Sequence, residues 1–74
     1  MLLEVRLFAT FRQGRFKMKE IQLPEGLLLG ELLVNLDISK KDVGILLVNG
    51  RHSNEDAILN AGDIVAIFPA VGGG

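Results

Sequence analysis

The residues of this sequence best suited to chemistry are its last three, Gly72, Gly73 and Gly74. Glycines lack side chains, so such a segment suits a narrow channel in which backbone must approach reacting atoms closely. The group that the segment carries is the α-carboxylate of Gly74, which is ionised at neutral pH. An ionised carboxylate resists nucleophilic attack, so chemistry at Gly74 requires prior activation, for which an acyl-adenylate made from ATP is the general solution.

The sequence offers no machinery of its own for that activation. It has no phosphate-binding loop motif, no cysteine and a single histidine, His52. We therefore expect a protein that binds no cofactor or metal and serves as the substrate of another enzyme, which uses ATP. Gly74 would be the reacting residue, and Gly72 and Gly73 would thread into the enzyme's active site.

The segment before the glycines, Phe68-Pro69-Ala70-Val71, connects them to the body of the protein. Pro69 cannot donate a ladder hydrogen bond, so strand pairing is predicted to end there. Six residues reach about 20 Å when extended, which is long enough to enter a partner's active site. The sequence thus predicts a domain over residues 1–68 and a flexible glycine tail over residues 69–74.

Composition limits the class of protein. The 74 residues suffice for one domain, with 49% hydrophobic residues, no Trp or Tyr and a net charge of −1. No apolar run approaches the roughly 20 residues of a membrane span, and no secretory signal opens the sequence, so we expect a cytoplasmic protein without a membrane partner. Four cations lie close together, but the overall charge and the few aromatic residues argue against nucleic-acid binding: Arg12, Arg15, Lys17 and Lys19.

Hydrophobic periodicity predicts the first elements. Residues 2–9 alternate as a half-buried strand, and residues 16–23 form a second strand whose two halves differ in parity, which predicts a bulge near Lys19-Glu20. Gly14 offers the turn between them. The leucines at 29, 32, 33 and 36 lie on one face of a short helix. Leu28 stands where a capping Ser, Thr or Asp is expected, so the start of this helix is poorly signalled.

The second half of the sequence predicts three more strand segments and a turn. Residues 45–48 and 51–53 flank Asn49-Gly50, the strongest short hairpin signal. Residues 57–59 fit one helical turn, and residues 64–68 read as a central strand buried on both faces. The order favours an α+β roll with the helix packed on one face of the sheet.

A docking surface near the tail is the second functional expectation. Phe8 falls on the charged face of the first strand, and Phe68, Pro69 and Val71 precede the glycines. Core packing is the alternative interpretation, especially for Phe68, but aromatic residues often anchor interfaces. His52, Glu55 and Asp56 lie beside turns, where a solvated surface is the expected role rather than metal binding or acid–base catalysis.

Several short motifs, in this order and spacing, resemble the MoaD/ThiS family of ubiquitin-like sulfur carriers over essentially the whole sequence. They are Phe8-Ala9 at the end of the first strand, Leu23-Pro24-Glu25-Gly26, Leu32-Leu33, Val48-Asn49-Gly50, Ala61-Gly62-Asp63-Ile64-Val65, and Phe68-Pro69-Ala70-Val71 before the glycines. The resemblance implies a β-grasp fold, with a mixed sheet of four to five strands and one main helix.

The resemblance also implies partners and a reaction. A ubiquitin-activating-enzyme-like adenylyltransferase would adenylate Gly74, which then becomes a thiocarboxylate that gives its sulfur to an acceptor enzyme. Phe68-Pro69-Ala70-Val71 favours the MoaD branch, whose acceptor is the molybdopterin synthase large subunit, over the ThiS branch, which serves thiazole synthase in thiamine synthesis. A ubiquitin-like modifier conjugated through Gly74 and a non-covalent β-grasp adaptor are the other hypotheses.

Overall fold

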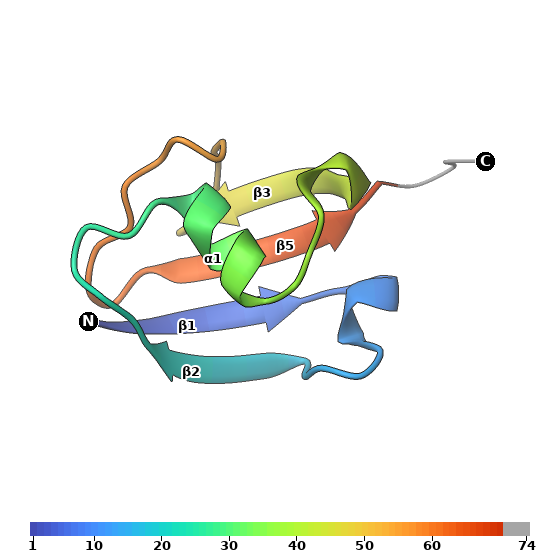
Figure 1. Cartoon of the computed structure of the whole chain (residues 1–74), viewed down its shortest axis with the longest axis horizontal. Coiled ribbons are helices and arrows are strands. Elements are labelled where there is room, and N and C mark those ends of the chain that lie inside the picture. The colour runs from blue at the N-terminus through green and yellow to red at the C-terminus, as the bar shows by residue number, and fades with distance from the viewer. Residues whose placement is uncertain (71–74) are drawn as a thin grey trace.

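The computed structural model describes residues 1–70, which fold into one five-stranded sheet and one α-helix (Figure 1). The elements, in chain order, are strand β1 (Leu2–Leu7), the 3-10 helix η1 (Ala9–Arg12), β2 (Met18–Gln22), α1 (Leu29–Asn35), the 3-10 helix η2 (Lys40–Asp42), β3 (Val43–Val48), β4 (Arg51–His52) and β5 (Ile64–Pro69). The strand order is β2-β1-β5-β3-β4, with β1 and β5 parallel and the other pairs antiparallel. This is the predicted β-grasp fold.

The first hairpin differs from its prediction in two respects. β1 ends at Leu7 rather than at residue 9, because the chain turns into η1. The predicted bulge in β2 is wrong, since the pairing runs without a slip from Leu2 opposite Gln22 to Arg6 opposite Met18. Met18 is 60% exposed and Phe16 precedes the strand. Neither residue therefore has to point to the core side of the sheet, and no bulge is needed.

Helix α1 packs on one face of the sheet, as its leucine spacing predicted. Leu29, Leu32 and Leu33 are buried. The helix ends in two backbone hydrogen bonds typical of a Schellman motif, from the N–H of Asp37 to Val34 and from the N–H of Ile38 to Leu33, at 3.0 and 2.9 Å. Tertiary packing therefore stabilises a helix of only seven residues.

The Asn-Gly hairpin signal is confirmed, whereas the helical turn over residues 57–59 is wrong. Asn49 and Gly50 both have positive φ, 53° and 80°, as a type I′ turn between β3 and β4 requires. In place of the helical turn, Ile58 forms an isolated antiparallel bridge with Leu28, and Leu59 is buried in the core. This connection runs alongside the start of α1.

β5 is the central strand of the sheet, but only one of its faces is fully buried. Val65 and Ile67 face α1 and are inaccessible to solvent, whereas Ile64, Ala66 and Phe68 are half-buried on the face that α1 does not cover. Strand pairing ends at Pro69, as predicted. Pro69 is the last residue of β5 and lies opposite Val43.

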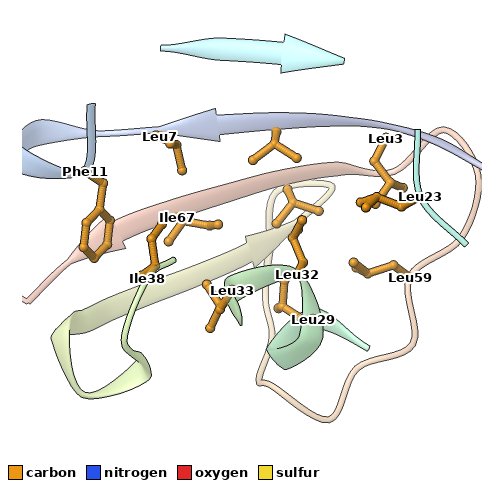
Figure 2. Packing of buried hydrophobic residues seen from close by; sticks show 12 residues of the cluster. Leu3, Leu7, Phe11, Leu23, Leu29, Leu32, Leu33, Ile38, Leu59 and Ile67 are labelled. Carbon is orange, nitrogen blue, oxygen red and sulfur yellow. The ribbon is translucent and has the colours of Figure 1, made fainter. Parts of the chain in front are cut away.

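The core lies between α1 and the sheet and is almost entirely aliphatic (Figure 2). It comprises twelve residues: Leu3, Val5, Leu7, Phe11, Leu23, Leu29, Leu32, Leu33, Ile38, Leu59, Val65 and Ile67. Within residues 1–70 no polar or charged side chain is buried. None of the helices in this range is long and apolar enough to span a membrane.

Candidate docking surface at the root of the tail

Phe8 and Phe68 lie side by side because parallel strands end at the same edge of a sheet. β1 and β5 run in register from Glu4 opposite Ile64 to Leu7 opposite Ile67, so the next residues on both strands are neighbours (Figure 1). Their rings stack with centroids 4.1 Å apart and an interplanar angle of 8°. The structure thus brings two of the predicted docking residues into direct contact.

Both phenylalanines are half-buried and lie outside the hydrophobic core. Side chains alternate along a strand, so Phe8 and Phe68 point away from α1 while their neighbours Leu7 and Ile67 point into the core. Core packing, the alternative considered for Phe68, is therefore not its role. Pro69 lies directly beside them at the end of β5. Val71, Gly72, Gly73 and Gly74 lie outside the described residues.

An apolar groove of about 370 Å³ opens next to this pair. It is lined by Phe8, Ala9, Gly44, Ile45, Phe68, Pro69 and Ala70. Ile45 pairs directly with Phe68 across the β3–β5 ladder and is 42% exposed. We call these seven residues the tail-root groove. Its size and lining suit an apolar side chain of a partner protein.

Arg12 packs against the Phe8 side of the groove. The sequence analysis did not predict this contact. Its guanidinium carbon lies 5.1 Å from the centre of the Phe8 ring, and its Nε donates a hydrogen bond of 2.6 Å to the carbonyl of Leu7. In the sequence Arg12 is one of four cations that lie close together, and in the structure η1 folds it back over the end of β1. Arg12 follows Phe8 by four residues, and one helical turn brings residues at this spacing into contact. This spacing is the feature of the sequence from which the contact could have been predicted.

Arg15 also has a structural role. It donates hydrogen bonds to the carbonyls of Phe11, Leu36 and Asp37 at 3.2, 3.0 and 2.9 Å. It thereby ties the loop after η1 to the end of α1. Two of the four clustered cations are thus bonded to backbone carbonyls of the protein itself.

The polar residues considered for metal binding and catalysis lie at the surface, where His52 and Asp56 are exposed and Glu55 is half-buried. Glu55 pairs with Lys40 at 2.6 Å on the surface, and the hydrogen bond and charge of Glu55 raise the pKa of Lys40. The N–H of Asp56 bonds to the side chain of Asn54 in a turn, and His52 is exposed on β4. Over residues 1–70, no group of three or more His, Cys, Asp or Glu side chains is placed to hold a metal ion.

Comparison with known proteins identifies a family. The family model described as ThiS family matches residues 5–74. A solved structure from Pyrococcus furiosus, described as molybdopterin converting factor subunit 1, is similar over 96% of this chain and 99% of its own, with 33% sequence identity and a TM-score of 0.77. None of the curated proteins matches the chain.

Two further structures share the fold at lower sequence identity. Small archaeal modifier protein 1 of Haloferax volcanii is 22% identical, with a TM-score of 0.76 over 95% of this chain and 98% of its own. A chain from the complex of subunits 1 and 2 of the molybdopterin-converting factor from Helicobacter pylori is 23% identical. Its TM-score is 0.67, and the match covers 100% of both chains. At these identities the likeness shows the fold alone.

Proposed function

Because this chain belongs to the ThiS family, we propose that it is a sulfur carrier protein whose cargo is bound at the carboxylate of Gly74. The observation that supports this most directly is the family match over residues 5–74, which includes the three glycines. Gly74 is the reacting residue, and Gly72 and Gly73 are the segment that threads into the active site of the partner. Phe8, Phe68, Pro69 and Val71 belong to the surface on which the partner docks.

The proposed reaction has two steps. The Gly74 carboxylate attacks the α-phosphorus of ATP and pyrophosphate leaves, which gives an acyl-adenylate. Hydrosulfide then attacks the acyl carbon, AMP leaves and the released proton goes to solvent, so that Gly74 ends as a thiocarboxylate. A ubiquitin-activating-enzyme-like adenylyltransferase supplies the ATP site. The sequence has no phosphate-binding loop motif with which the chain could supply that site itself.

We further propose that the sulfur is used in molybdopterin synthesis, with this chain as the small subunit of the synthase. This assignment is supported by the relative from Pyrococcus furiosus, which is 33% identical and is described as molybdopterin converting factor subunit 1. The neighbour from Helicobacter pylori was solved as a complex of subunits 1 and 2, which is consistent with docking on a second subunit. Transfer to thiazole synthase is the alternative within the same family.

The test is the intact mass of the chain with its C-terminus at Gly74. The chain is incubated with ATP, a candidate adenylyltransferase from the same cell and sulfide. We expect a product in which one carboxylate oxygen is replaced by sulfur, and no such product from a chain that lacks Gly73 and Gly74. An unchanged mass with several competent activating enzymes would contradict the proposal.

The same experiment separates the remaining hypotheses when cell proteins are added. A protein modifier, the role named for the Haloferax volcanii neighbour, would become linked by an amide to a lysine of a target. A non-covalent adaptor would instead bind its partner equally well without Gly73 and Gly74. We expect neither result.

A further inference from the structure

The root of the tail, Pro69 and Ala70, is held by a β-bulge at the start of β3. Pro69 lies opposite Val43, but the next pair along the ladder joins Phe68 to Ile45, so Gly44 is an extra residue on β3. Beyond the bulge, the N–H of Ala70 donates a hydrogen bond of 2.9 Å to the carbonyl of Asp42. The β3 and β5 segments therefore remain hydrogen-bonded or paired on both sides of Gly44.

Gly44 has no room for a side chain. A Cβ at this position would lie 2.8 Å from the Cα of Ala70, 2.8 Å from the carbonyl oxygen of Pro69 and 3.0 Å from the nitrogen of Ala70. All three atoms belong to the backbone, which cannot rotate away as the end of a flexible side chain can. Gly44 is not among the glycines with positive φ, so its role is close approach rather than conformational freedom.

We infer that Gly44 is a positioning residue that fixes where the reactive tail begins relative to the docking surface. The bulge holds Ala70 against β3, and Gly44 also lines the tail-root groove beside Phe8 and Phe68. One residue thus contacts both the surface on which a partner docks and the backbone that carries Gly74. This inference rests on the proposed function, since it concerns delivery of the Gly74 carboxylate to the activating enzyme.

The first test is Gly44→Ala. The added methyl group pushes the backbone at Pro69–Ala70 away from β3. It thereby breaks the hydrogen bond from the N–H of Ala70 to the carbonyl of Asp42. We expect amide hydrogen exchange at Ala70 to become at least about tenfold faster, because a hydrogen-bonded amide becomes free to exchange. We expect kcat for adenylation to fall about tenfold or more while KM for the carrier changes by less than about threefold, because the carboxylate is misplaced while Phe8 and Phe68 still dock.

Two further variants separate positioning from stability. Gly14→Ala places a side chain at a φ of +69° with open space around it, so it costs stability through strain but touches neither the groove nor the tail root. It should keep the wild-type kcat. Ala70→Pro removes the N–H donor without adding an atom at Gly44, and it should lower kcat as Gly44→Ala does.

The outcomes distinguish this inference from the proposed function. A wild-type chain that no activating enzyme adenylates overturns the proposed function and the positioning role with it. A wild-type chain that is adenylated, beside a Gly44→Ala chain with the same kcat, overturns the positioning role alone. If Gly44→Ala does not fold, Ala70→Pro decides, and a wild-type kcat for that variant overturns the inference.

Discussion

Asp37 has a left-handed backbone at the end of α1, with a φ of 58°. It occupies the position in the Schellman motif where glycine is preferred, since a Cβ is strained at this φ. Its carboxylate also lies near the negative end of the helix dipole. We predict that Asp37→Gly raises the free energy of unfolding by about 1 kcal/mol, measured by urea denaturation. The backbone hydrogen bonds that end the helix are unchanged by this substitution.

Asp37→Ala is the matched control for this prediction. It removes the carboxylate but keeps the Cβ at the strained φ, so it should recover only the part of the gain that comes from charge. If Asp37→Ala is as stable as Asp37→Gly, the left-handed backbone is not the cause. The carbonyl of residue 37 still accepts the hydrogen bond from Arg15 in both variants.

Single residues also show which parts of the candidate site the sequence could predict. Phe8 was predicted as a docking residue because it falls on the charged face of the first strand, and Phe68 because it precedes the glycines. The structure places the two side by side. Gly44 and Arg12 were missed. Their roles depend on a β3–β5 register shift and on a 3-10 turn, and neither is encoded in the periodicity of one strand.

At the scale of elements, the start of α1 shows how contacts distant in sequence replace a local signal. Leu28 offers no side-chain cap, as expected, but its N–H donates to the carboxylate of Glu31 at 2.9 Å, which is half of a capping box. The N–H groups of Leu29 and Gly30 donate to the carbonyls of Ala57 and Glu55 at 2.8 and 2.9 Å. The free N–H groups of the first turn are thus satisfied by another segment of the chain.

This arrangement predicts the effect of changing Glu31. Glu31→Ala removes the acceptor for the N–H of Leu28 and a negative charge in the first turn, so it should lower the free energy of unfolding by about 1 kcal/mol. Glu31→Gln keeps an acceptor oxygen and should recover part of that loss. Thermal or urea denaturation of the two variants measures the difference, and equal stabilities for Glu31→Ala and the wild type would contradict this account of the helix start.

Elements with their own sequence signal were predictable, and those that depend on contacts with distant parts of the chain were not. The leucines of α1 and the Asn49-Gly50 turn carry their own signal and agree with the structure. Residues 57–59 fit a helical turn by local pattern, but pairing of Ile58 with Leu28 and burial of Leu59 favour an extended chain. Burial of β5 on both faces was expected from its composition, but the single α-helix of residues 1–70 covers one face only.

At the scale of the whole molecule, the two faces of the sheet have different roles. One face packs against α1 and contains the core, whereas the other ends in the stacked pair of Phe8 and Phe68 beside the tail root. The proposed docking surface can therefore change without disturbing the core. This separation allows a partner contact to be tested independently of folding.

We predict that Phe8→Asp leaves the fold intact and weakens binding to the adenylyltransferase or the acceptor by roughly thirtyfold, since an aromatic anchor of an interface is worth about 2 kcal/mol. Titration calorimetry measures the affinity, and circular dichroism checks the fold. Val34→Asp is the matched control, because Val34 is apolar and 78% exposed but lies on α1, on the opposite side of the sheet. Equal affinities for the two variants would show that the partner does not use the tail-root groove. An unfolded Phe8→Asp chain would show that the stacked pair stabilises the domain as well, and Ile45→Asp, at a more exposed position of the same groove, would then measure the contact.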